Sequence, residues 1–196
     1  MDASFDHADK ELWVFGYGSL IWRPGFEYIE RVPAHVIGLH RSLCVYSFDH
    51  RGTPERPGLV LGLDFGGACR GIAYHVAVKH RAATLAYLRE REQTTAVYRE
   101  MVRNVLLEGK PERRVDALCY VVDRGHVQYA RGLSHDRQLE IVRRAHGRSG
   151  NNRDYVVETV KALEALKIID HDLHILAERL KGHDTQAAAD PGVSYR

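Results

Sequence analysis

The sequence has few cysteines and no long hydrophobic run. Three of its 196 residues are cysteine, and this odd, widely spaced set predicts neither a disulfide framework nor a CxxC metal site. The apolar runs fall far short of the ~20 residues that a membrane-spanning helix needs. The acidic start of the chain, MDASFDHADKE, is unlike a signal peptide. We therefore expect a cytoplasmic protein with no membrane partner, whose cysteines are buried as small apolar side chains.

The sequence also lacks an excess of charge of one sign. Its 28 basic and 26 acidic residues give a formal net charge of only +2, and they are interleaved instead of forming a basic stripe. This balance argues against a nucleic-acid partner. The hydrophobic fraction of 44% is that of an ordinary globular protein. We expect a single domain over 12–182, a flexible N-terminal extension over 1–11 and a flexible C-terminal tail over 183–196.

The pattern of apolar residues predicts strands in the first part of the chain and helices at its end. Segments rich in β-branched and aromatic residues predict strands at 13–22, 36–48, 59–65, 70–78, 97–107 and 115–123. Apolar residues at helical spacing predict helices at 80–92, 134–147, 152–168 and 170–182, with Ser134 and Asp170 as N-caps. This order favours an α+β domain with a helical C-terminal third, and a small barrel is one form that its sheet can take.

The first hydrophobic segment, WVFGYGSLIW (13–22), is interrupted by the tetrapeptide GYGS. Glycine is a weak strand former and permits backbone angles that other residues avoid, so the strand ladder must break there. The break leaves backbone N–H groups without partners, and successive inward-facing amides form a nest for a carboxylate or an oxyanion. A β-bulge with no ligand explains the same pattern and is the favoured interpretation from these residues alone.

Glu92 is expected at the C-terminal end of the helix over 80–92, among several charged residues. Such a run is typical of a solvated helix face. Glu90 and Glu92 lie about 200° apart around a helix, so they do not share a face, and one can point inward while the other meets solvent. An inward carboxylate with a raised pKa is suited to act as a general base.

Two other kinds of catalytic site are not indicated. His171 and His174 are one helical turn apart, but no HExxH motif, nearby cysteine or third ligand accompanies them, so a zinc site is not predicted. Ser19 and Ser149 both lack the G-x-S-x-G context of a hydrolase nucleophile.

Five short motifs occur in order along most of the chain. They are FGYGSLIW (15–22), DHRGTPERPG (49–58), RGIAYHV (70–76), YLREREQTTAVY (87–98) and GRSGNNRDYV (147–156). The polar motifs have ordinary loop composition when taken singly. Together the five resemble the ChaC family of γ-glutamylcyclotransferases, in its glutathione-specific branch. One departure is that Arg91-Glu92 is followed by QTTAVY, where the family commonly has glycines and a tyrosine, so the loop after Glu92 is expected to move differently.

The resemblance implies a small mixed β-barrel packed with helices, with neither a cofactor nor a metal. It also implies a lyase that splits glutathione into 5-oxoproline and cysteinylglycine, with Glu92 as the catalytic acid and base. The residues that the resemblance assigns to substrate binding are Tyr17, Gly18, Ser19, Leu20 and Tyr155. Two alternatives stay open, namely a cyclotransferase for another γ-glutamyl amine or amino acid, and a non-catalytic regulator of cation transport.

Overall fold

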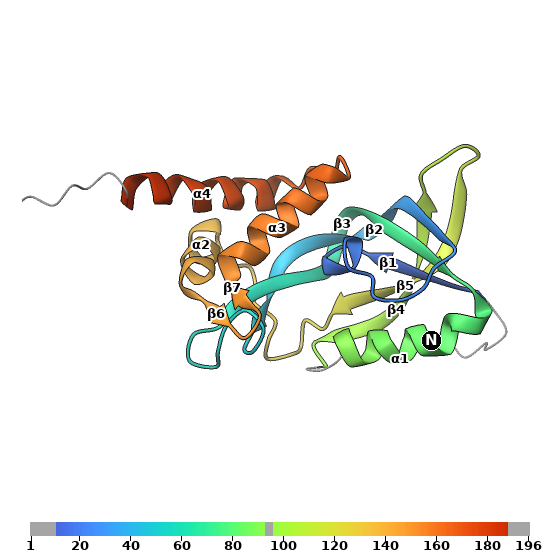
Figure 1. Ribbon diagram of the computed structural model, residues 1–196, viewed down its shortest axis with the longest axis horizontal. Coiled ribbons are helices and arrows are strands. Elements are labelled where there is room, and N and C mark those ends of the chain that lie inside the picture. Colours follow the sequence, from blue (N-terminus) through green and yellow to red (C-terminus); the bar gives the residue numbers. More distant parts are fainter. Residues whose placement is uncertain (1–10, 93–95, 188–196) are drawn as a thin grey trace, which may run out of the picture. The chain divides into compact units, whose positions relative to one another are not determined.

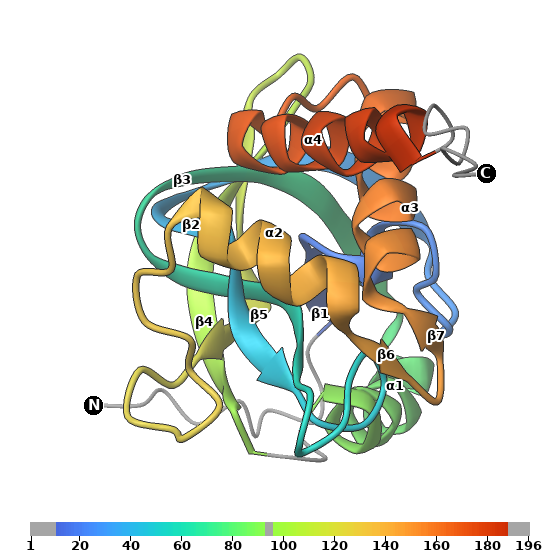
Figure 2. The same cartoon turned by 90° about the vertical axis from the view of Figure 1, so that its left-hand side faces the viewer.

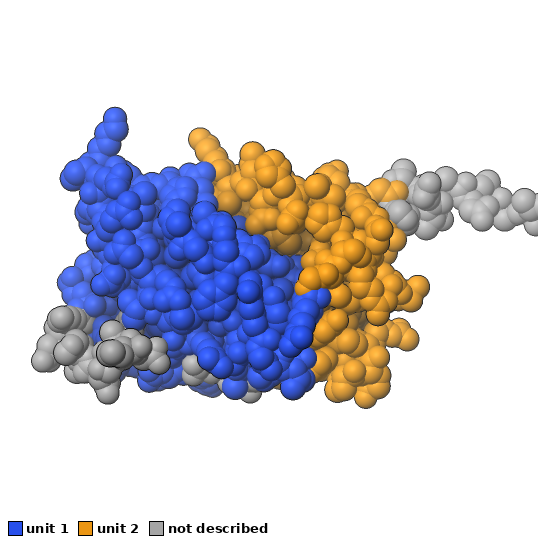
Figure 3. Space-filling view, turned by 180° about the vertical axis from the view of Figure 1, so that it is seen from behind, with its two compact units in different colours: residues 1–45, 61–131 blue, residues 46–60, 132–196 orange. Residues whose placement is uncertain are grey.

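The computed structural model describes residues 11–92 and 96–187, which form two compact units (Figure 3). The first unit comprises residues 1–45 and 61–131, and the second comprises residues 46–60 and 132–196. Most of the predicted N-terminal extension and of the predicted C-terminal tail lies outside the described residues, as does the start of the loop after Glu92. The single domain expected over 12–182 stays a prediction.

The first unit is built on a closed barrel of five strands (Figure 1). Around the barrel the order is β1-β3-β2-β4-β5, and β5 closes the ring by pairing with β1. That closing pair is parallel, whereas β1–β3 and β4–β5 are antiparallel, so the predicted small mixed barrel is confirmed. The strands are β1 (Leu12–Gly16), β2 (Glu30–Ser47), β3 (Gly58–Val76), β4 (Tyr98–Leu107) and β5 (Arg113–Val122).

The long strand β3 differs from the sequence prediction. Two strands were expected, at 59–65 and 70–78, but one strand of 19 residues runs through both. Gly66 and Gly67, which suggested a turn, have φ angles of 105° and 64° within this strand. Such left-handed angles bend a strand without ending it, because glycine has no Cβ to obstruct them.

The hairpin of β4 and β5 confirms the strands expected at 97–107 and 115–123. Its antiparallel register runs from Tyr98 opposite Val122 to Leu107 opposite Arg113. The inner face of the barrel is apolar and closely packed, because alternate residues of each strand point inward. The largest fully buried side chains of the barrel strands lie on both faces of the sheet and include Phe15, Leu63, Ile72, Tyr74, Leu118 and Tyr120.

The helix α1 (Val78–Glu92) follows β3 directly and confirms the helix expected at 80–92. Its buried face is formed by Arg81, Thr84 and Leu88, whereas the apolar Ala83 is exposed. The buried positions follow the i, i+3, i+7 spacing of one helix face, but two of them are polar. A pattern search based on apolar residues alone therefore misplaces this face.

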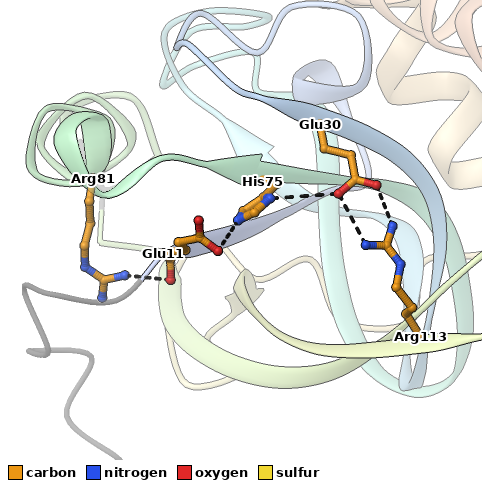
Figure 4. Close-up of polar contacts among 5 residues, drawn as sticks. All are labelled: Glu11, Glu30, His75, Arg81 and Arg113. Atoms are coloured by element: carbon orange, nitrogen blue, oxygen red, sulfur yellow. Dashed lines mark hydrogen bonds and ion pairs between the residues drawn. The ribbon is translucent and has the colours of Figure 1, made fainter.

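Polar contacts around His75 hold the start of β1 (Figure 4). The His75 ring stacks on Trp13 with ring centroids 4.5 Å apart, and its Nε2 atom lies 2.8 Å from a carboxylate oxygen of Glu11. On its other side Nδ1 lies 3.8 Å from Glu30, which forms an ion pair with Arg113. These contacts connect β1, β2, β3 and β5, so they support the order of the strands on this side of the barrel.

The second unit is mainly helical, as expected for the C-terminal third. Its helices α2 (His135–Arg144), α3 (Asn152–Ala165) and α4 (His171–Ala187) pack against one another in pairs (Figure 2). Ser134 caps α2 as predicted, since its side chain accepts a hydrogen bond from the Arg137 amide. The Asp170 carboxylate likewise accepts from the Leu173 amide. The fourth helix does not end at Gly182, where the sequence predicted its end, but continues to Ala187.

A short hairpin of β6 (His146–Gly147) and β7 (Gly150–Asn151) precedes α3 in the second unit. Each of its strands has only two residues, too few for an alternation of apolar and polar residues to predict a strand. None of the described helices combines the length and the apolar character needed to cross a membrane.

Candidate active site

The strand β1 ends at Gly16, and the segment after it turns into a short 3-10 helix, η1 (Ser19–Ile21). The strand therefore does not resume after GYGS. A Cβ atom at Gly16 would lie 3.1 Å from the Leu20 Cβ and 3.3 Å from the Tyr74 ring. These distances are tighter than ordinary contacts, so the fold itself favours glycine at position 16.

The carbonyl groups of the YGSL loop, residues Tyr17 to Leu20, are held from the barrel side. Arg41, which is buried, donates from Nε to the Tyr17 carbonyl at 2.5 Å. The Tyr74 hydroxyl donates to the Leu20 carbonyl at 2.8 Å and also lies 3.0 Å from the Ile21 carbonyl. Burial raises the pKa of Tyr74, so its hydroxyl stays protonated and able to donate.

The first amides of η1 are not used by the hydrogen bonds of that helix. These bonds begin with the Ile21 amide, which donates to the Gly18 carbonyl at 2.9 Å. The amides of Ser19 and Leu20 therefore have no acceptor within the helix itself. GYGS alone favoured a β-bulge over a nest, but the strand ends at Gly16. The binding role of Tyr17, Gly18, Ser19 and Leu20 stays a prediction.

Glu92 lies in the last turn of α1, in the first unit, with a side chain that is 16% exposed. Burial raises the pKa of its carboxyl group, and the neighbouring Arg91 guanidinium partly opposes this rise. Glu90 is exposed to solvent, as expected for two residues on different faces of one helix. The structure thus gives Glu92 the environment of a general base, because a raised pKa strengthens a carboxylate as a proton acceptor.

Arg91 links this carboxylate to the YGSL loop. Its Nε atom lies 3.3 Å from a Glu92 oxygen, and its Nη2 atom donates to the Ser19 hydroxyl at 2.8 Å. Two of the predicted site regions, 72 positions apart in sequence, are therefore brought together by one side chain. Sequence reasoning treated Arg91 only as a flanking charge. Its position beside Glu92 in the YLREREQTTAVY motif was the available signal.

A second carboxylate, Glu100, lies on β4 and is linked to Tyr120 of β5. The Tyr120 hydroxyl donates to Glu100 Oε1 at 3.2 Å, and Arg89 pairs with both oxygens of Glu100 at 2.9 and 3.0 Å. The pKa of Tyr120 is raised by burial, by Glu100 and by the charge of Glu92. The phenol is therefore neutral when Glu92 is ionised.

In the second unit the structure brings two polar motifs of the sequence together. The amides of Arg148 and Ser149 donate to the carbonyls of Asp49 and His50, each at 3.0 Å. A Cβ atom at Gly147 would lie only 2.3 Å from the Asp49 carbonyl oxygen. The glycine in HGRSGNNRDY is thus required by close backbone contact with DHRGTPERPG.

Tyr155 lies on α3 in this second unit. The Arg51 guanidinium lies over its ring, 5.3 Å from the ring centroid. Arg51 also donates to the Asn151 carbonyl at 3.2 Å. Within its own unit Tyr155 therefore belongs to the paired loops, and its role in substrate binding stays a prediction.

The part of the chain that the structure describes contains no group of three His, Cys, Asp or Glu side chains arranged to hold a metal ion. His174 of the suspected histidine pair instead contacts the Asp170 carbonyl at 2.6 Å and lies 3.6 Å from Glu164.

The comparisons with known proteins agree with this arrangement. The chain is 31% identical to the glutathione-specific γ-glutamylcyclotransferase of Schizosaccharomyces pombe, over 85% of this chain and 90% of the relative. It is 30% identical to the protein of the same name from Escherichia coli, over 87% of this chain and 73% of the relative.

A solved structure supports the fold. The crystal structure of the yeast γ-glutamyl cyclotransferase specific to glutathione matches with a TM-score of 0.80 and 25% sequence identity, covering 88% of this chain and 96% of the other. The model of the family described as ChaC-like protein matches residues 12–182, which include β1, the YGSL loop and Glu92. The chain therefore belongs to the ChaC-like protein family.

Proposed function

We propose that the protein is a glutathione-specific γ-glutamylcyclotransferase, a lyase that converts glutathione into 5-oxoproline and cysteinylglycine. The observation that carries this proposal is the link, through Arg91, between the largely buried carboxylate of Glu92 and the Ser19 hydroxyl of the YGSL loop. The relatives that bear this name, at 30–31% identity, support the choice of glutathione as the substrate.

The proposed reaction needs no nucleophile from the protein. In a γ-glutamyl amide the α-amine is tethered to the γ-carbonyl, and its attack closes a five-membered ring. The new C–N bond forms while the bond to the cysteine amine breaks, and no water is consumed. Such intramolecular closures gain several kcal/mol over a bimolecular attack.

In this proposal Glu92 performs both proton transfers. Its carboxylate takes a proton from the α-ammonium group, which makes the amine nucleophilic, and then returns it to the departing cysteine amine. The ring nitrogen loses a second proton as it becomes the lactam amide, and this proton also passes to the departing amine, which leaves as an ammonium group. The amides of Ser19 and Leu20 donate to the oxyanion of the tetrahedral intermediate, whose stabilisation by one well-placed donor is typically worth ~3 kcal/mol. The Ser19 hydroxyl accepts from Arg91, so its own proton is directed elsewhere and is available to a substrate oxygen.

The test of the proposed function is the release of 5-oxoproline by the purified protein. Glutathione, γ-Glu-Cys and a γ-glutamyl amine are supplied separately, and 5-oxoproline is quantified by chromatography. We expect release from glutathione and little from the other two. Preferred release from another compound supports the alternative cyclotransferase, and no release from any of them supports a non-catalytic role.

The two glycines of GYGS give a matched pair of variants. A Cβ atom at Gly18 would meet only the Leu61 side chain, at an ordinary 3.6 Å, whereas one at Gly16 would press on Leu20. We expect Gly18→Ala to keep its thermal stability but to raise KM about tenfold or more, because the added methyl group keeps the substrate from a hydrogen bond with the neighbouring Ser19 and Leu20 amides. We expect Gly16→Ala to lower the melting temperature. Unchanged KM in Gly18→Ala would show that the substrate does not approach these amides.

The proposal includes a cytoplasmic location. The cysteines Cys44, Cys69 and Cys119 are all buried free thiols, as is typical of proteins from reducing compartments. Burial raises the pKa of both Cys44 and Cys119 to about 12. These thiols are therefore poor nucleophiles, and we do not expect them to exchange with the thiol of glutathione.

A further inference from the structure

The guanidinium of Arg91 makes contacts in three directions at the junction of the YGSL loop and α1. Nη2 donates to the Ser19 hydroxyl at 2.8 Å, and Nη1 donates to the Arg23 carbonyl at 2.7 Å. Nε faces the Glu92 carboxylate at 3.3 Å. One planar group therefore contacts the start of η1, the segment after η1 and the end of α1.

Arg91 is itself held in place by Tyr87, one helical turn earlier. Nη1 donates to the Tyr87 hydroxyl at 2.7 Å, and the guanidinium carbon lies 5.9 Å from the centre of the Tyr87 ring. The Tyr87 hydroxyl is fixed in turn under Gly25, where a Cβ atom would lie 2.0 Å from it. Gly25 also has a φ angle of 76°, which favours glycine. The guanidinium is thus restrained from both sides.

We propose that Arg91 is the positioning residue of the active site, which fixes the Glu92 carboxylate relative to the YGSL loop and orients the Ser19 hydroxyl. The proposal rests on the proposed function, because it concerns the geometry of the same reaction. A misplacement of about 1 Å between reacting groups can cost 100-fold in rate. The residues directly after Glu92 lie outside the described part of the chain. Within the described residues, the contacts of Arg91, directly before Glu92, hold the end of α1.

The shape of the guanidinium matters to this role as much as its charge. Arginine presents five donors in a rigid plane, whereas lysine presents a compact ammonium group on a flexible stem. A lysine at position 91 would keep a positive charge near Glu92 but would not contact Ser19, Arg23 and Tyr87 together. Substitution can therefore separate the effect of the positive charge on Glu92 from the effect of the contacts with Ser19, Arg23 and Tyr87.

The charges around Glu92 determine what each substitution does to its titration. On α1 its charged neighbour is Arg91, and its own charge also raises the pKa of the Tyr120 phenol on β5, which stays neutral. Behind Tyr120 the charges of Glu100 and Arg89 are paired with each other. Removal of the Arg91 charge would raise the pKa of Glu92 further, because it removes the group that opposes the effect of burial.

The experiment compares Arg91→Ala, Arg91→Lys and the control Arg114→Ala, an exposed arginine of β5 that pairs with Glu112. Steady-state kinetics with glutathione are measured across pH, together with thermal unfolding. We expect Arg91→Ala to lose about 100-fold in kcat and to shift the acid limb of kcat/KM to higher pH, and added guanidine to restore part of kcat. Arg91→Lys should keep the limb in place and lose part of kcat, while Arg114→Ala should behave like the wild type.

Several outcomes would overturn the positioning role. Wild-type kcat in Arg91→Ala contradicts it, and so does a loss that follows only the fall in melting temperature, with no shift of the acid limb and no rescue by guanidine. A wild-type protein that releases no 5-oxoproline contradicts the proposed function itself. An active wild type with an unaffected Arg91→Ala contradicts the positioning role alone.

Discussion

Replacing Glu92 with glutamine is expected to abolish the release of 5-oxoproline from glutathione while the fold is kept. Glutamine has nearly the same shape but neither accepts nor returns the proton, so the variant loses the general acid–base contribution of roughly 10²–10⁴-fold. The measurement is the initial rate of 5-oxoproline formation, with circular dichroism to confirm the fold. The matched control is Glu90→Gln on the exposed face of the same helix, which should keep its activity.

The same variant is also expected to differ from the wild type in its stability across pH. Because burial raises the pKa of Glu92 in the folded protein, the protonated carboxyl contributes stability that is complete below the ordinary pKa of glutamate. This contribution is lost as the pH rises through the raised pKa of the folded state. Glutamine does not ionise, so Glu92→Gln should gain stability relative to the wild type as the pH rises through this window.

Thermal unfolding of both proteins between acidic and neutral pH measures this difference. The opposite result is that the wild type gains stability relative to Glu92→Gln as the pH rises. It would show that the carboxylate is better stabilised in the fold than in water. The carboxylate would then be poorly suited to accept a proton from the substrate. Equal activity of Glu92→Gln and the wild type would remove Glu92 from the catalytic step.

Replacing Asn152 with alanine is expected to destabilise the second unit strongly. Asn152 is completely buried, and its side chain pairs with both backbone groups of Leu59, donating to the carbonyl and accepting from the amide at 2.7 Å each. Leu59 is also fully buried, so alanine would leave its N–H and C=O without partners. Each such buried group costs about 1–3 kcal/mol, and we expect a loss of about 2–5 kcal/mol.

Urea unfolding, with the midpoint and slope compared between variants, measures this loss. The control is Asn151→Ala at the preceding position, where the side chain is exposed, does not cap the α3 backbone and contacts the side chains of His146 and Asp154 at the surface. Surface substitutions of this kind usually change stability by less than about 0.5 kcal/mol. Similar small effects of both substitutions would mean that the buried pairing of Asn152 with Leu59 does not hold the loop to the helix.

Much of the fold could be predicted from local sequence signals. Ser134 predicted the start of α2, and β-branched and aromatic residues predicted the two strands, at 97–107 and 115–123, that form the β4–β5 hairpin. Glycines were a weaker guide, because Gly66 and Gly67 bend β3 without ending it and Gly182 does not stop α4. A glycine permits a turn, but the hydrogen bonds of neighbouring segments decide whether the strand or helix continues.

The sequence by itself determined the class of the fold, the order of its elements and the family, because strand and helix periods, caps and the FGYGSLIW motif all lie within short stretches of chain. Only the tertiary structure showed that Arg91 joins Ser19 to Glu92, that Tyr74 holds the YGSL loop and that Asn152 pairs with Leu59. These partners are 72, 54 and 93 positions apart in sequence. Their pairing depends on how the barrel closes and how the loops pack, and no local pattern of residues contains that information.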